Sequence, residues 1–362
     1  MRFRGLAMWI AISLLAAVGI APVSRWALLN HAESLGGGWR RSWPERKLAP
    51  QWLDNPSAYR SDHENSALVQ ACLKVELAAA GVASGDELAL QKFAEAHRQN
   101  ALAWAATIRY GFSRGFRSLG DVAPTEDLAR KRSATLSRIA EACKRGALLE
   151  PSNAFFPTML AASELLVGNV GSAKAALHSA ASLKAFDTHL NDEIEARRRA
   201  IAESFGYRGE AINATSIATA TKLDESLFDS LALRLSIEPD LRVHRDMMQL
   251  GITLLNHGYF PAGRVLFSVA LAPPEDISGM SRGERDLRQV EAARAFGKAL
   301  AKAGIAQTVP APEIAAIKFT EMRSKIANAA AWEPVHPEST LPHLLLASLA
   351  ILICLGLAVH WT

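Results

Sequence analysis

A helical rhythm that runs from Ser66 to about Ala331 constrains this chain more than any other feature. Alanine and leucine recur there at spacings of three and four residues, and small or polar residues separate one such segment from the next. Apolar residues at that spacing line one face of an α-helix, whereas a half-buried strand needs a strict alternation that the sequence lacks over any useful length. The sequence therefore predicts an all-α protein.

The breaks in the rhythm set the boundaries of the individual helices. They predict helices over residues 67–80, 85–97, 101–112, 125–149, 154–167, 171–183, 187–205, 209–222, 225–236, 241–256, 261–271, 283–303 and 312–331. The connections between them are short, and short loops make successive helices antiparallel neighbours. Because 49% of the residues are hydrophobic, the chain can bury a substantial core. We therefore expect a body of packed helical hairpins.

Two stretches of this body resemble the tetratricopeptide repeat. The first stretch fills the lead-in, helix A, turn and helix B positions of that repeat with Pro151, Asn153, Leu160, Ala161, Gly168, Ala173, Leu177 and Ala180. The second fills them, from helix A onward, with Leu250, Gly251, Gly258, Phe260, Gly263, Phe267 and Ala270. Small residues let the two helices approach closely, large ones fill the gap beside them, and glycine permits the tight reversal.

The resemblance also has departures. Pro157 and Glu164 replace the tryptophan and tyrosine of the repeat, and Trp104 marks a weaker echo earlier in the chain. Leu160 and Leu250 are not separated by a multiple of the roughly 34-residue period. The spacing indicates an array interrupted by the helices between about Lys184 and Asp240.

The resemblance implies an α-solenoid whose helix A row presents a concave binding groove. By that resemblance the groove would be lined by Phe155, Thr158, Ala162, Leu165, Arg245, Met248, Ile252 and Asn256. The alternative for these side chains, and above all for the apolar ones, is packing inside the molecule against the interrupting helices.

Two apolar runs lie at the ends of the chain. Leu6–Val23 follows two arginines and is uncharged, and Leu341–Trp361 contains no Asp, Glu, Lys or Arg. Each approaches the roughly 20 apolar residues that cross a bilayer as a helix. We expect both to be transmembrane helices. The alternatives are a cleaved signal peptide for the first run, although Pro22 makes a poor cleavage site after Ala21, and a buried core helix for the second.

These runs define the predicted layout of the chain: an N-terminal transmembrane anchor or signal peptide (1–24), a linker with interleaved tryptophan and arginine (25–66), the repeat-like domain (67–331), a short linker (332–340) and a C-terminal transmembrane helix (341–362). The tryptophans of the first linker suit either lipid headgroups or packing on the helical body. Arg2 and Arg4 slightly favour a cytoplasmic N-terminus. We expect both termini to contact lipid, in the inner (cytoplasmic) membrane, with the helical body on the extracytoplasmic side.

The sequence contains no catalytic motif that we recognise. His63-Glu64 lacks the second histidine of a zinc hydrolase, and the serine elbow, the dinucleotide fingerprint and the kinase motifs are absent. The three cysteines are widely spaced and form no zinc pattern, although a Cys72–Cys143 bridge stays open. A formal charge of +4, not gathered in one run, gives no reason to expect a nucleic-acid partner. We expect no catalytic residue, metal or cofactor.

One charged stretch needs its own interpretation. In "NDEIEARRR" the pairs Glu193–Arg197 and Glu195–Arg199 each stand four residues apart, which is the spacing of ion pairs on a solvated helix face. The sequence therefore predicts that both pairs are exposed to water.

The expected function is that of a membrane-anchored helical-repeat scaffold or assembly factor, with a protein or peptide partner that is itself membrane-associated. An envelope enzyme with an unrecognised site on the helical body is the alternative, and a spacer that holds something away from the bilayer is a third possibility.

Overall fold

The computed structural model describes residues 55–60, 62–115, 126–205, 216, 220–224, 226–271, 281–308 and 310–332. These residues form 12 α-helices and no strand, so the predicted all-α class is confirmed for this part of the chain. Asp54–Arg208 and Thr215–Met322 together form one compact unit, and the features described below belong to it, apart from residues 323–332 at the end of the last helix.

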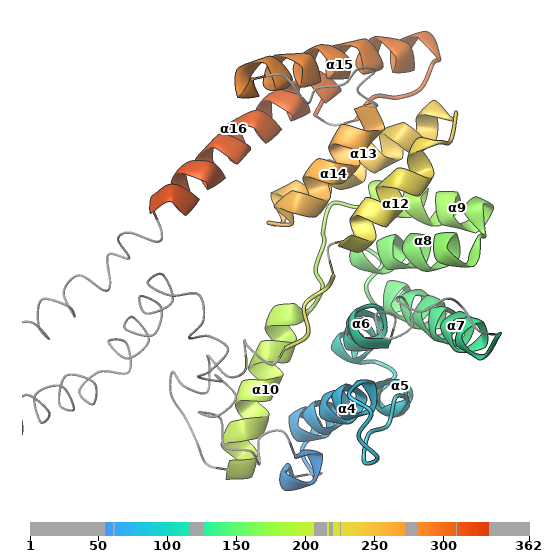
Figure 1. Cartoon of the computed structure of the whole chain (residues 1–362), viewed down its shortest axis with the longest axis vertical. Helices are drawn as coiled ribbons and strands as arrows, with labels where there is room; N and C mark the ends of the chain where they lie inside the picture. Colours follow the sequence, from blue (N-terminus) through green and yellow to red (C-terminus); the bar gives the residue numbers. More distant parts are fainter. Residues whose placement is uncertain are drawn as a thin grey trace, which may run out of the picture. The chain divides into compact units, whose positions relative to one another are not determined.

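The first half of this unit is a row of helices in which each packs against the next (Figure 1). A 3-10 turn, η3 (Pro56–Ala58), precedes the row, and α6 continues into a π-helical turn, η4 (Gly111–Gly115). The helices are α4 (Glu64–Ala79), α5 (Ala89–Ala96), α6 (Ala101–Tyr110), α7 (Glu126–Leu149), α8 (Phe155–Val167) and α9 (Val170–Ala181).

The second half contributes α10 (Leu190–Phe205), α12 (Ser226–Ser236), α13 (Leu241–Asn256), α14 (Phe260–Leu271), α15 (Arg282–Lys302) and α16 (Pro312–Trp332). Here α13 packs against α14, and α14 packs against α15. Although α10 and α12 separate them in sequence, α9 packs directly against α13. The row of neighbouring helices therefore continues from α9 to α13. Of the intervening segment, α10 packs on α4 and α6, whereas α12 packs on α14 and α8.

Most predicted helices agree with the observed ones within a few residues. The predicted helix over 209–222 falls mostly outside the described residues. The largest shift that has a clear cause is at α10, which begins at Leu190 rather than at residue 187. His189 takes a left-handed backbone conformation with φ of 56°, and Ala185 pairs as an isolated bridge with Asn153. Both features hold the chain out of helical geometry until Leu190.

Glycine shapes two hairpins of the row, α8–α9 and α13–α14. Gly168, between α8 and α9, and Gly258, between α13 and α14, have φ of 93° and 85°, which an L side chain rarely adopts. Gly251 and Gly263 allow α13 and α14 to touch through their backbones. A Cβ added to Gly251 would lie 2.8 Å from the Gly263 carbonyl oxygen, and the reverse distance is 2.7 Å.

The core is one cluster of buried side chains that extends from Leu68 in α4 to Phe319 in α16. We call the segment between α9 and α13 the insertion. Aromatic contacts connect the parts of the core beside it: the Phe186 ring lies 5.9 Å from the Phe155 ring and 5.0 Å from the Tyr259 ring. Phe186 follows α9 in sequence, so the start of the insertion is anchored between α8 and the α13–α14 turn.

Within the described part of the chain, no helix combines the length and the apolar character that a membrane span requires. The predicted transmembrane segments 1–24 and 341–362 lie outside the described residues, and their placement stays a prediction.

Candidate functional site

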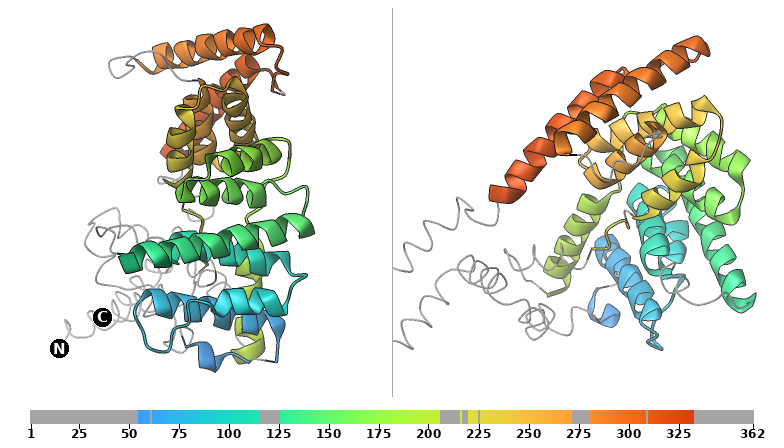
Figure 2. Two further views of the ribbon diagram at one scale, coloured as in Figure 1. Left: turned by 90° about the vertical axis from the view of Figure 1, so that its right-hand side faces the viewer. Right: turned by 45° about the horizontal axis from the view of Figure 1, so that its top comes forward.

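Most of the buried charged side chains of the unit lie in α10 or against it, namely Arg109, His189, Glu193 and Arg197. Helix α10 packs against α4 and α6, and it runs along the row while α4 and α6 run across it (Figure 1 and Figure 2, left). At its end, Phe205 contacts the Tyr59 ring at 5.2 Å and the Ser204 hydroxyl lies 3.3 Å from that of Ser66. Just before its start, the His189 ring lies 6.3 Å from Phe156 in α8. α10 thus extends from the start of α8 to the start of α4.

A buried ion network joins α10 to the two helices beneath it. The Glu193 carboxylate lies between two guanidinium groups, 2.7 Å from Arg109 of α6 and 2.9 Å from Arg197 of α10. The Tyr110 hydroxyl lies 3.0 Å from Glu193 and accepts a hydrogen bond of 2.5 Å from Arg197. Glu76 of α4 completes the network, 3.4 Å from Arg197. The side chains of Arg109, Glu193 and Arg197 are at most 3% exposed, so each charge depends on the others for compensation.

Arg109 also holds the backbone on both sides of α10. Its Nη1 donates to the Thr221 carbonyl at 2.7 Å, and its Nη2 donates to the His189 carbonyl at 3.5 Å. One guanidinium of α6 therefore fixes the chain before and after α10 as well as the carboxylate within it.

The network shifts the pKa of its buried carboxyl group and that of a neighbouring thiol. Burial opposes ionisation of Glu193, but the charges of Arg109 and Arg197 outweigh it, and the pKa of the Glu193 carboxyl is lowered. Burial, together with the Glu193 carboxylate, raises the pKa of the neighbouring Cys72 thiol to about 12. A thiol with so high a pKa stays protonated and is a poor nucleophile at neutral pH.

The prediction that both ion pairs of "NDEIEARRR" are solvated is wrong for Glu193–Arg197 and right for Glu195–Arg199, which is exposed and joined at 2.9 Å. A four-residue spacing shows that two charges are neighbours on a helix, but it does not show which face meets the protein. The partners that make burial tolerable, Arg109 and Glu76, come from helices distant in sequence.

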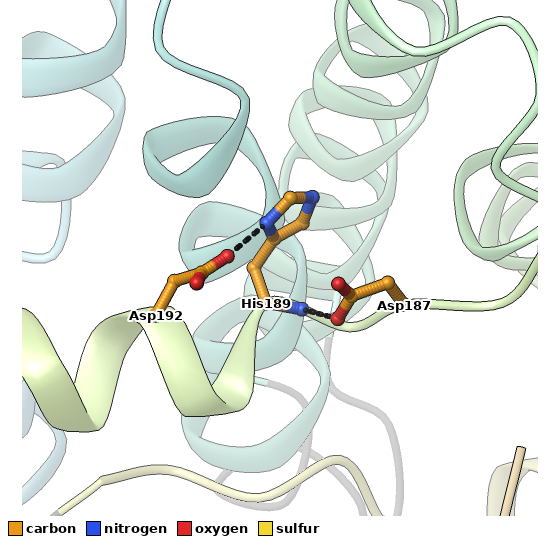
Figure 3. Close-up of side chains that lie close together, drawn as sticks. All are labelled: Asp187, His189 and Asp192. Carbon is orange, nitrogen blue, oxygen red and sulfur yellow. Dashed lines mark hydrogen bonds and ion pairs between the residues drawn. The ribbon is translucent and has the colours of Figure 1, made fainter.

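A second cluster surrounds His189 (Figure 3). Its Nδ1 lies 2.7 Å from Asp192 and its Nε2 lies 2.9 Å from Glu150, which follows α7. The backbone N–H of His189 donates to Asp187 at 2.7 Å, which supports the left-handed conformation. The His189 cluster, as we call these four residues, thus connects the end of α7 to the start of α10.

This cluster has the donor types of a divalent-cation site, because ligand atoms of Asp187, His189 and Asp192 lie within 4.8 Å of one another. Both imidazole nitrogens already meet a carboxylate, however. Burial opposes the charged ring, yet hydrogen bonds to Asp192 and Glu150 outweigh burial and raise the pKa of His189. A protonated imidazole donates two hydrogen bonds and has no lone pair for a metal. The arrangement as it stands works as an ionic clamp.

The residues predicted to line a groove are mostly buried. Phe155, Thr158, Ala162 and Leu165 are buried in α8. The last two line a narrow crevice against α12, whose Arg234 donates to the Leu165 carbonyl at 3.2 Å. These contacts are with one of the interrupting helices.

The α13 members of the predicted groove divide into two groups. Met248 and Ile252 are buried, whereas Asn256 is exposed at the helix end. Arg245 pairs with Asp246 at 2.5 Å and lies 3.4 Å from His178 of α9, at the contact between α9 and α13. The groove itself stays a prediction.

Sequence reasoning missed Arg109, Tyr110 and Glu76 as members of a site. One signal was present: Arg109 interrupts the otherwise apolar run "ALAWAATIRYGF". A charged residue within an apolar helix requires a buried partner, but the sequence does not identify that partner.

The fold and these clusters define an all-helical protein whose adjacent helices pack against each other. No protein-family model matches the chain, and no curated protein or solved structure matches it either.

Proposed function

We propose that this protein is a membrane-anchored helical-repeat scaffold or assembly factor that binds protein partners. One observation carries the proposal: α9 packs directly on α13 despite the inserted segment between them. The hairpins α8–α9 and α13–α14, which carry the two stretches that resemble tetratricopeptide repeats, are therefore neighbours in space. Successive stacking of hairpins is how repeat proteins build an extended binding surface.

The geometry of the two hairpins supports the repeat interpretation. Each has a glycine with positive φ in its turn, Gly168 in one and Gly258 in the other. Ala173 and Leu177 of the first hairpin are fully buried, and Gly251 meets Gly263 in the second. These are the small and large positions that the repeat requires. In a repeat array, successive helices of the row alternate between helix A and helix B. This order assigns the helix A positions to α4, α6, α8 and α13, and the helix B positions to α5, α7, α9 and α14.

A scaffold also suits the chemistry of the two polar clusters better than an enzyme does. A catalytic group must reach its substrate, whereas Glu193 and Arg109 are fully buried and His189 is occupied on both ring nitrogens. In these clusters the polar groups act on each other, and what they determine is the position of α10.

The membrane part of the proposal rests on the uncharged runs Leu6–Val23 and Leu341–Trp361. Two spanning helices would leave the repeat body on one side of the inner membrane, and we propose the extracytoplasmic side. A body fixed at both ends would hold its partners close to the bilayer.

Affinity purification of the full chain from detergent-solubilised membranes tests the function. We expect a second subunit in stoichiometric amount. The double variant Arg245→Ala/Asn256→Ala, which changes the polar residues of the predicted groove, should reduce its recovery. Glu195→Gln, on the exposed face of α10, is the matched control and should not. Recovery of the folded chain alone in several mild detergents would contradict the proposal. Protease access in intact and opened cells then determines which side carries the body.

A further inference from the structure

We propose that the face of α4 and α6 covered by α10 is a docking surface for a partner helix, and that α10 is the occupant that the chain itself supplies. This inference rests on the helical-repeat binding function proposed above. It places partner binding on the face of α4 and α6, and it specifies the ligand as a helix with an acid–arginine pair.

The first argument is that α10 is not a structural member of the row. The neighbours α8, α9, α13 and α14 follow one another without it, because α9 contacts α13 directly. α10 turns back instead to α4 and α6, which belong to earlier hairpins. A helix that the row does not need for its continuity can leave without opening the contacts between successive hairpins.

The second argument is the direction in which α10 lies. It runs along the row and crosses the helices beneath it (Figure 2), from the region of Phe156 at its start to Tyr59 at its end. By the alternation of hairpins, α4, α6 and α8 are all helix A. α10 thus lies across the helix A face, where a bound ligand would contact several hairpins at once.

The third argument is the division of charges across this contact. The row supplies Arg109, Tyr110 and Glu76, and α10 supplies Glu193 and Arg197. Glu193 and Arg197 stand four residues apart, so they share one face of the helix. A partner helix that carries a carboxylate and, four residues later, a guanidinium group on one face can make the same contacts with Arg109, Tyr110 and Glu76.

The fourth argument is the small apolar contribution of α10. Its fully buried apolar side chains are Ala196, Ala200 and Ile201, and the half-buried Phe205 adds the ring contact with Tyr59 at its end. Buried ion pairs contribute specificity more than net stability, because the cost of removing charges from water offsets their attraction. When α10 leaves, the buried guanidinium group of Arg109 gains access to water and part of that cost is recovered. The contact is therefore selective and exchangeable, and it fits a partner helix with small residues beside an acid–arginine pair.

Hydrogen exchange on the full wild-type chain in detergent micelles tests whether α10 opens by itself. We expect the amides of the second half of α10 to exchange at least tenfold faster than the slowest amides of α6 and α8, with those helices still protected. Equal rates in α10, α6 and α8 would mean that α10 opens only with the whole unit, and would overturn the inference.

A peptide with the sequence of residues 190–205, fluorescently labelled, tests the chemistry. Its target is a full chain in which Glu193→Ala and Arg197→Ala weaken the internal occupant but leave Arg109, Tyr110 and Glu76 in place. We expect the peptide to bind this variant at least tenfold more tightly than the wild-type chain. A control peptide of identical composition, with Glu193→Arg and Arg197→Glu, should bind at least tenfold more weakly than the native peptide. Equal binding of the two peptides would overturn the inference.

Circular dichroism checks that the double variant keeps its helix content, and if it does not, the wild-type exchange pattern decides alone. The two proposals fail separately. A stoichiometric partner together with an α10 that never opens by itself contradicts only the docking inference. An α10 that opens and binds its own peptide in a chain without any partner contradicts the scaffold function.

Discussion

Glu193 shows at the scale of one residue how α10 is held. Its carboxylate compensates Arg109 from another helix and Arg197 from its own. The helix period correctly made Glu193 and Arg197 neighbours, but their burial could not be predicted from the sequence, because it depends on Arg109 and Glu76 arriving from α6 and α4. The same holds for His189, whose carboxylate partner Glu150 lies far from it in the chain.

Neutralising Glu193 should release α10. Glu193→Gln leaves Arg109 and Arg197 buried without their counter-charge, and breaking a buried pair costs about 3–5 kcal/mol. We expect the free energy of opening of α10, measured by hydrogen exchange, to fall by about 3–5 kcal/mol. If the wild-type value is smaller than this, α10 should be fully undocked in the variant. Glu195→Gln, on the exposed face, should change it by less than about 0.5 kcal/mol. Similar effects of the two substitutions would show that the Glu193 network does not hold α10.

His189 should make stability depend on pH. Its pKa is raised in the folded state, so the stabilisation from its charge is complete below the unfolded pKa of about 6.5 and is lost as pH rises through the folded pKa. His189→Asn tolerates the left-handed backbone but carries no charge. We therefore expect the stability difference between wild type and variant, from urea denaturation, to be largest below about pH 6.5 and to shrink as the pH rises above it.

Glu150→Gln is the companion variant for His189. It removes one of the carboxylates that favour the imidazolium, so it should reduce the pH dependence while leaving the histidine in place. A wild-type advantage over His189→Asn that stays constant or grows with pH would contradict the ionic clamp.

At the scale of elements, the sequence predicts most helices because their period and their breaks are local properties. The glycines of both turns were also identified from the repeat pattern, and Gly168 and Gly258 indeed have positive φ. What the pattern could not predict is that α10 would pack on α4 and α6. The period shows that a helix has a buried face, but it does not name the helix that covers it.

The glycine contact between α13 and α14 should be sensitive to a single methyl group. In Gly251→Ala the new Cβ would lie 2.8 Å from the Gly263 carbonyl oxygen, and two helix backbones must separate to admit it. We expect a loss of about 1–3 kcal/mol in unfolding free energy. Gly171→Ala in α9 is the control, because nothing lies within 4 Å of its added Cβ, and it should be neutral or stabilise by up to about 1 kcal/mol. Denaturant unfolding of both variants measures the difference, and equal values would contradict the close contact.

At the scale of the whole molecule, the sequence suggested an array interrupted between about Lys184 and Asp240. The packing of α9 on α13 brings the two repeat-like stretches into direct contact, although α10 and α12 separate them in sequence and α12 packs on α14 and α8. The spacing of two repeat-like stretches along a chain does not show whether an insertion separates them or loops out beside them.

The proposed anchoring predicts a simple result in cell fractionation. The full chain should remain with the membranes through a high-salt wash, because about 20 apolar residues in a bilayer resist extraction by salt. A chain without residues 1–24 and 341–362 should appear in the soluble fraction, and removal of one end alone should leave it membrane-bound. Release of the full chain by salt would contradict two spanning helices.

The packing of α10 on earlier helices also has a consequence for how the chain folds. Contacts from α4 to α9 join neighbours in sequence and can form early, since local contacts close short loops. The contact of α13 on α9 must first close a loop that contains α10 and α12, although the entropy of closure grows only slowly with loop length. α10 must return to α4 and α6, which are synthesised well before it, and must close a loop that contains α7, α8 and α9. We therefore expect the helix that covers the docking surface to settle after the helices from α4 to α9, so that a nascent chain passes through a state in which this surface is open.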